Sequence, residues 1–148
     1  FIGPCLAKRR EGFDDDSVDY VLSVEELRAF FIAKDIDIAS LPAKQPDHVP
    51  TSTGRGFAKT GGVAEAVRGR LKDQSILKAA QINGLDRAGM KKLATYGMIN
   101  QGKIAKNENT PNLVEVMACE SGCIGGPSVI TNPAVAEGLL AAYAKGGT

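Results

Sequence analysis

The sequence predicts an α/β fold in which a mostly parallel, four-stranded sheet is flanked by helices. The first observation is a set of short apolar or alternating runs, typical of strands, near residues 1, 20, 79 and 115. The second is that segments with the apolar spacing of amphipathic helices separate most of these runs. Strands that alternate with helices along a chain are typical of a parallel sheet with helices on its faces.

Length and composition fit one globular domain. The chain has 148 residues, which is enough to bury a hydrophobic core, and it is 43% hydrophobic and 24% charged. Its net charge of +1 does not favour nucleic acid or an acidic membrane surface as a partner. No apolar run approaches the roughly 18 to 20 residues of a membrane span.

The cysteine count and the first residues bear on the origin of the chain. Three cysteines, an odd number, argue against a disulfide framework and favour a reducing compartment, so a cytoplasmic location is expected. The chain opens on Phe1 without a signal peptide, in residues that resemble the end of a strand. We therefore expect a fragment of a longer protein.

The first half of the chain is expected to form a strand, a helix, an irregular loop and a second helix, over residues 18–22, 23–34, 41–59 and 60–72. Apolar and polar residues alternate in the first of these segments. Ser23 and Glu26 have the spacing of a capping box, which predicts the start of the helix. Prolines and glycines break up the long loop, and loops of this length are usually functional or disordered.

The second half is expected to form two strands, each followed by a helix, over residues 76–82, 85–96, 113–117 and 132–143. The turn at Asn83 and Gly84 ends the first strand, and Gly97 is expected to end the first helix. Asn132 followed by Pro133 is the favoured order of an N-cap and a first helical residue.

The three cysteines form the most informative pattern of the sequence. Cys119 and Cys123 have a C-x3-C spacing in a glycine-rich turn after a strand, and Cys5 also follows apolar residues. Parallel sheets bind ligands at the carboxyl ends of their strands, and thiolates are soft ligands for iron–sulfur clusters. The alternative is that the cysteines are small buried hydrophobic residues. Zinc is disfavoured because His48, in a proline-rich loop, is the only histidine.

Two further groups accompany the cysteines. Lys8 lies three residues after Cys5, so that both side chains can face one pocket, where a lysine compensates an anionic cluster. A surface charge is the alternative. Gly61 and Gly62 follow Thr60 directly before a predicted helix, where free backbone N–H groups can bind an anion. Here the alternative is an ordinary turn.

These groups together resemble the catalytic domain of the iron-only, or [FeFe], hydrogenases. Residues 3–11 are similar to that family's second signature, a Pro-Cys followed by Lys and then Glu. Residues 115–126 are similar to its third signature, and residues 57–66 to a Thr-Gly-Gly-Val segment between the two. The resemblance implies that residues 1–148 are the second lobe of the H-cluster domain, without the N-terminal lobe and the ferredoxin-like domains.

The resemblance also implies the roles of the cysteines. Cys5 and Cys119 would bind the [4Fe-4S] cubane of the H-cluster, and Cys123 would bridge the cubane to the two-iron subcluster. The implied reaction is the reversible conversion of two protons and two electrons to H2. The implied partners are the rest of the hydrogenase chain and a ferredoxin-type electron carrier.

Other residues receive their roles from the same resemblance. Lys8 matches a lysine expected to contact a cyanide ligand, and Met117 matches a methionine packed on the two-iron unit. Thr60, Gly61 and Gly62 are assigned to cofactor binding.

The chain also departs from the family's pattern. The first signature, with a further cubane cysteine, is absent and would precede Phe1, so the isolated chain is expected to be cluster-free and inactive. Its exposed face is expected to promote dimers. Gly3, Ala64 and Pro127 replace family residues, a pattern closer to sensory or divergent members. The alternatives are a hydrogenase-like iron–sulfur assembly protein, an H2-sensing regulatory protein without fast turnover, and a redox-inert interaction module.

Overall fold

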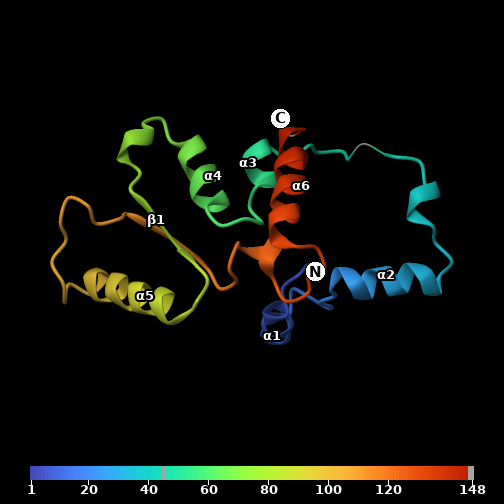
Figure 1. The fold of residues 1–148 in the computed structure, drawn as a ribbon, viewed down its shortest axis with the longest axis horizontal. Coiled ribbons are helices and arrows are strands. Elements are labelled where there is room, and N and C mark those ends of the chain that lie inside the picture. The colour runs from blue at the N-terminus through green and yellow to red at the C-terminus, as the bar shows by residue number, and fades with distance from the viewer. Residues whose placement is uncertain (45, 147–148) are drawn as a thin grey trace.

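The computed structural model describes residues 1–44 and 46–146. Its described elements are an α/β set of helices and a small parallel sheet, which lies at one side of the molecule (Figure 1). In chain order they are α1 (Ala7–Asp14), α2 (Val24–Ala33), η1 (Ile38–Ser40), α3 (Ser52–Arg55), α4 (Gly62–Arg70), η2 (Gln74–Ile76), β1 (Ala79–Asn83), α5 (Arg87–Asn100), β2 (Leu113–Met117), η3 (Cys123–Gly125) and α6 (Pro133–Lys145).

The sheet consists of β1 and β2, which pair in parallel and are connected through α5. Ala79 pairs with Leu113 at one end of the register, and Asn83 pairs with Met117 at the other. The span of β2 is the one predicted. β1 begins later than predicted, because Gln74–Ile76 form a 3-10 turn that the Asp73 side chain caps.

The prediction of four strands is not confirmed, since the sheet of the described residues has two strands. The expected strands near residues 1 and 20 are reduced to a single parallel bridge between Ile2 and Leu22. The pairing is short because each segment is interrupted at once. Pro4 has no N–H to donate to a ladder, and Ser23 already begins the cap of α2.

The predicted caps are confirmed. At the start of α2, the Glu26 amide donates to Ser23 Oγ at 3.1 Å, and the Ser23 amide donates to Glu26 Oε2 at 2.8 Å. Asn132 accepts from the Ala134 amide at the start of α6, with Pro133 in the first helical position.

Two predicted boundaries differ from the structure. α5 continues through Gly97 to Asn100, and Gly102, with a φ of 73°, follows its end. Gly97 is tolerated inside the helix, since a glycine weakens a helix without breaking its hydrogen bonds. The predicted loop 41–59 contains the short helix α3, which Thr51 caps, and residue 45 of that loop lies outside the described residues.

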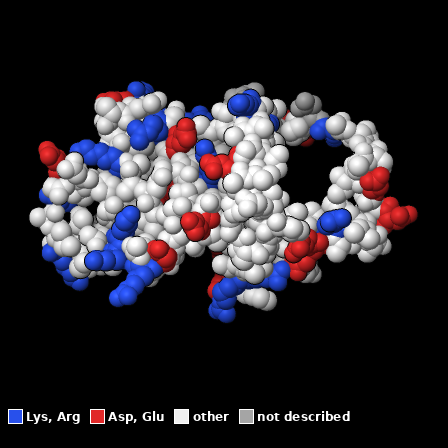
Figure 2. Space-filling view, in the orientation of Figure 1, with Lys and Arg blue, Asp and Glu red and all other residues white. Residues whose placement is uncertain are grey.

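The arrangement is open rather than layered around one large core. α6 stands near the middle of the view, with the sheet and α5 on one side and α2 on the other (Figure 1). Figure 2 shows an opening between α2 and the segment that leads to α3. Ala64 and Ile82 are the buried hydrophobic residues of the described part of the chain. None of the described helices is long and apolar enough to cross a membrane.

Candidate functional site

The loop that carries Cys119 and Cys123 is a tight turn at the carboxyl end of β2. The Gly122 amide donates to the Cys119 carbonyl at 3.1 Å, and Cys123 then begins a 3-10 turn. Ser121 and Gly122 both have positive φ values, of 67° and 77°. The glycine is needed there, because a side chain at residue 122 would lie 2.8 Å from the Ala58 carbonyl oxygen.

Backbone contacts join this loop to the segment that precedes α4. Lys59 and Gly122 form an antiparallel bridge, and the Ile124 amide donates to the Ala58 carbonyl at 3.2 Å. The cysteine loop therefore rests on residues 58–59, far from it in the sequence.

A third segment brings Cys5 to the same region. The Ser128 amide donates to the Pro4 carbonyl at 3.3 Å, directly before Cys5. Lys8 lies in the first turn of α1 and pairs with Glu11. The structure thus brings Cys5 and Lys8 to the loop of Cys123, where their charges act on the Cys123 thiol.

Hydrogen bonds, neighbouring charges and desolvation shift the pKa values of Lys8 and Cys123. The hydrogen bond to Glu11 raises the pKa of Lys8 above its usual value, and the negative charges of Cys5 and Cys123 add to this effect. Cys123 is exposed as a residue, but the surrounding protein removes part of the water from its thiol. This desolvation raises the pKa of Cys123; Cys5 and Cys119 raise it further, whereas Lys8 opposes the shift.

The three cysteines are the type of residue that binds an iron–sulfur cluster. Cys5, Cys119 and Cys123 are free thiols, and thiolates are the usual ligands of such clusters. The described residues contain no group of three or more His, Cys, Asp or Glu that could hold a metal ion. A cubane does not require such a group, because each thiolate binds a different iron atom. Three thiols are one fewer than the usual four.

The backbone amides at the start of α4 already donate hydrogen bonds to a carboxylate, that of Glu115. The Gly61 amide donates to Glu115 Oε1 at 3.0 Å, and the Ala64 amide donates to Glu115 Oε2 at 3.0 Å. The Thr60 hydroxyl donates to Asn83 Oδ1 at 2.6 Å. The Gly61 amide is therefore not free in this structure, and cofactor binding by Thr60, Gly61 and Gly62 stays a prediction.

Sequence reasoning gave no role of their own to Glu115, the first residue of the third signature, or to Asn83, which it placed only in a turn. Glu115 is 7% exposed in the middle of β2, and its carboxylate is bound by the start of α4. The signal was a charged residue inside an apolar run that predicts a buried strand. Asn83 follows β1 and accepts hydrogen bonds from Thr60 and from the Ser121 amide. Met117 is half-buried at the end of β2, two residues before Cys119.

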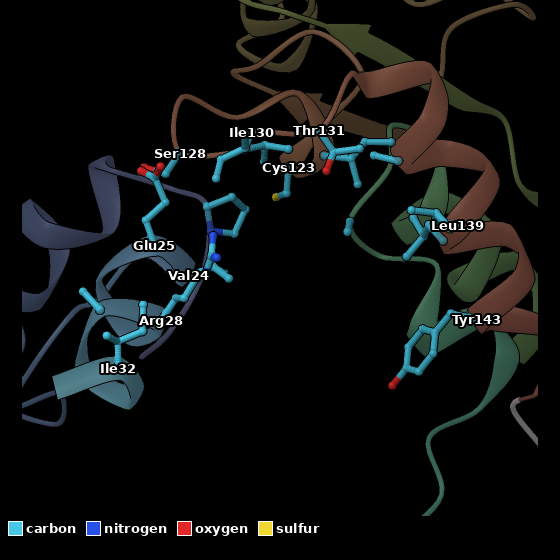
Figure 3. A pocket seen from close by; sticks show the side chains of 17 residues that line it. Val24, Glu25, Arg28, Ile32, Cys123, Ser128, Ile130, Thr131, Leu139 and Tyr143 are labelled. Carbon is cyan, nitrogen blue, oxygen red and sulfur yellow. The ribbon is translucent and has the colours of Figure 1, made fainter. Parts of the chain in front are cut away.

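An apolar groove opens beside Cys123. It has a volume of about 930 Å³ and lies between α2 and α6 (Figure 3). Val24 and Ile32 line the α2 side, and Leu139 and Tyr143 line the α6 side. The thiol of Cys123 thus borders both the charged group around Lys8 and a wide apolar surface.

Comparisons with known proteins agree on one family. The family described as "Iron only hydrogenase large subunit, C-terminal domain" matches residues 1–127. The NADP-reducing hydrogenase subunit HndD of Solidesulfovibrio fructosivorans is 32% identical, over 83% of this chain and 26% of that protein. The periplasmic [Fe] hydrogenase large subunit of Nitratidesulfovibrio vulgaris is 28% identical, over 93% of this chain and 40% of that protein.

The fold of the chain is similar to that of a solved structure. It is described as "Stepwise [FeFe]-hydrogenase H-cluster assembly revealed in the structure of HydA(deltaEFG)" and is similar with a TM-score of 0.57 at 22% identity. The similarity covers 97% of this chain and 51% of that chain. The chain therefore spans about half of the solved structure, and 26% and 40% of the two relatives.

Proposed function

Because the chain belongs to the family of the iron-only hydrogenase large subunit, C-terminal domain, we propose that it forms part of an iron hydrogenase. The hydrogenase would interconvert H2 with protons and electrons at an H-cluster. The observation that carries this proposal is the backbone contact that brings the segment of Cys5, shortly before Lys8 and α1, to the loop of Cys119 and Cys123 at the carboxyl end of β2. Residues 1–148 would form the second lobe of the cluster-binding domain.

Each residue of the group has a role in this proposal. When bound, the H-cluster supplies the redox chemistry of hydrogen conversion. The thiolates of Cys5, Cys119 and Cys123 hold the cluster. Lys8 places a positive charge beside those thiolates, and its pairing with Glu11 favours the charged form. Met117 presents an apolar, polarisable side chain next to the cysteine loop.

The rest of the hydrogenase chain is the partner that the proposal requires. The relatives named above are much longer than this chain, and the site described here has three thiols rather than four. The missing ligand and the cover of the apolar groove beside Cys123 would both come from that part of the parent protein. A ferredoxin-type protein would carry the electrons.

Iron binding tests the assignment of the thiols. The parent protein is reconstituted anaerobically with iron and sulfide, and its iron content and cluster spectra are measured. We expect Cys5→Ser and Cys119→Ser each to lower the bound iron strongly, because each removes a cluster ligand. Ser121→Ala, in the same loop as Cys119 but without a thiol, is the matched control. Iron content unchanged in both cysteine variants would refute the assignment.

A further inference from the structure

The buried carboxylate of Glu115 binds the first turn of α4. Its Oε1 accepts from the amides of Gly61 at 3.0 Å and Val63 at 3.4 Å, and its Oε2 accepts from the amide of Ala64 at 3.0 Å. The amides of a helix's first turn have no partners within the helix, and the helix dipole favours a negative charge there. Glu115 thus fixes β2 to the start of α4 through charge-assisted hydrogen bonds.

The start of α4 is in turn packed tightly on the preceding segment. The Gly62 amide donates to the Lys59 carbonyl at 3.1 Å. A side chain at residue 62 would lie only 2.0 Å from the Gly56 carbonyl oxygen, so the two backbones are in direct contact. A movement of the start of α4 would therefore displace residues 56–61.

Residues 58–60 carry the cysteine loop. The Ile124 amide donates to the Ala58 carbonyl, and Lys59 bridges to Gly122. Asn83 adds an independent link, because its Oδ1 accepts both from Thr60 Oγ1 at 2.6 Å and from the Ser121 amide at 2.7 Å. Contacts are thus continuous from Glu115 to the turn between the two cysteines.

We infer that Glu115 is a positioning residue, which sets the loop of Cys119 and Cys123 by anchoring α4 and, through α4, residues 56–61. It does not touch the thiols itself. A role of Glu115 in cluster binding rests on the proposed function, whereas its effect on the position of the cysteine loop does not. Glu115 therefore determines where β2 delivers the two thiolates relative to Cys5.

Amide hydrogen exchange of the 148-residue chain tests this inference without a metal. In Glu115→Gln, the neutral side chain keeps one acceptor oxygen, but its NH2 group faces either the Ala64 amide or the amides of Gly61 and Val63, where it cannot accept a hydrogen bond. A lost hydrogen bond to a buried charged group accelerates local exchange by about ten- to a hundredfold. We expect this acceleration at residues 61–64 and also at residues 121–124, with no change in α5 and α6.

The control is Glu65→Gln, which removes an exposed carboxylate from the first turn of the same helix. It should leave exchange in residues 121–124 unchanged. Acceleration confined to residues 61–64 would overturn the inference, because Glu115 would then only cap α4. Uniform acceleration in a folded variant would assign Glu115 to overall stability and overturn the inference equally.

A second variant keeps the test decisive if Glu115→Gln does not fold. Glu115→Asp retains the charge on a shorter side chain, and we expect it to show the same local pattern. Exchange in residues 121–124 that equals that of the unaltered chain would overturn the inference. None of these measurements depends on cluster binding, so they can fail while the proposed hydrogenase function stands, and the reverse also holds.

Discussion

At the scale of single residues, the pKa of Cys123 is subject to two opposing influences. Desolvation and the neighbouring thiols raise the pKa of Cys123, and the cation of Lys8 lowers it. In the chain without a cluster, the neutral thiol is therefore favoured. The same cation is available to stabilise thiolates once they are charged, as metal binding requires.

The pH dependence of alkylation tests this balance. In the complete chain, the alkylation rate of Cys123 should reach half its maximum above the ordinary thiol pKa of 9.0. Lys8→Met should move this midpoint higher, because it removes the one influence that lowers the pKa. The control Lys91→Met should leave the midpoint unchanged. A midpoint that falls in Lys8→Met would contradict the electrostatic account.

The same shift has a consequence for stability. A thiol whose pKa is raised on folding stays protonated in the folded chain at a pH where it ionises in the unfolded chain. Its contribution to stability is therefore present below pH 9.0 and is lost as the pH rises through the folded pKa. Denaturation in urea at increasing pH should show this loss, and Cys123→Ser should weaken it.

The residues of the candidate site were predictable only in part. The three cysteines and Lys8 stand in recognisable spacings, and the structure brings Cys5, Lys8 and Cys123 near one another. Glu115 and Asn83 could not be found in this way. Their partners lie more than 20 positions away, at Gly61, Thr60 and Ser121, so only the tertiary structure reveals them.

At the scale of the elements, local side-chain chemistry sets several helix boundaries. Ser23→Ala should destabilise the chain by about 1 kcal/mol, because it removes the N-cap of α2. The free energy of unfolding in urea measures this loss. Ser52→Ala, at an exposed position of α3 without a side-chain hydrogen bond in the described structure, should change it by much less. Equal effects would show that the capping box contributes nothing specific.

Two glycines inside helices are expected to respond in opposite directions to the same substitution. Gly62→Ala should destabilise by about 1 to 3 kcal/mol, since its new methyl group would meet the Gly56 carbonyl oxygen. Gly97→Ala should stabilise by about 0.5 to 1 kcal/mol, because apart from the adjoining helix backbone no described atom would lie within 4 Å of the new methyl group, and alanine favours the helix. Thermal and urea denaturation compare the pair. The same sign in both would contradict the packing of α4 described here.

The elements that sequence reasoning predicted correctly are those with local signals. The caps at Ser23 and Asn132 and the apolar run of β2 depend on a few neighbouring residues. The extent of the sheet depends on distant partners. The segments at Ile2 and Leu22 have strand-like sequences but meet at one bridge only. The prediction that Gly97 ends α5 was wrong, because a glycine lowers the stability of a helix but does not by itself end it.

The molecule as a whole exposes more surface than a compact protein of its size. Its accessible surface is 10989 Å², whereas a folded monomer of 15.5 kDa exposes about 7,200 Å². Ile130 is 76% exposed and Leu139 is 64% exposed in the apolar groove beside Cys123. In Figure 2, the middle of the molecule presents mainly uncharged residues. These surfaces favour association with further protein.

Sedimentation velocity tests this expectation. At increasing concentration, the complete chain should self-associate in the absence of the parent protein's other parts. Leu139→Glu should reduce this association, because it places a charge in the groove. Phe13→Glu, at an 85% exposed position of α1 outside the groove, is the control. A monomer at all concentrations would remove the groove as an association surface.

Infrared spectroscopy of the parent protein, after anaerobic reconstitution and maturation, tests the central claim most directly. If Cys5, Cys119 and Cys123 hold part of an H-cluster, bands from iron-bound CO and cyanide appear, and Cys123→Ser removes them. A cubane signal without those bands would instead support an assembly-type relative. A protein that binds no iron at all would contradict the hydrogenase assignment of this site.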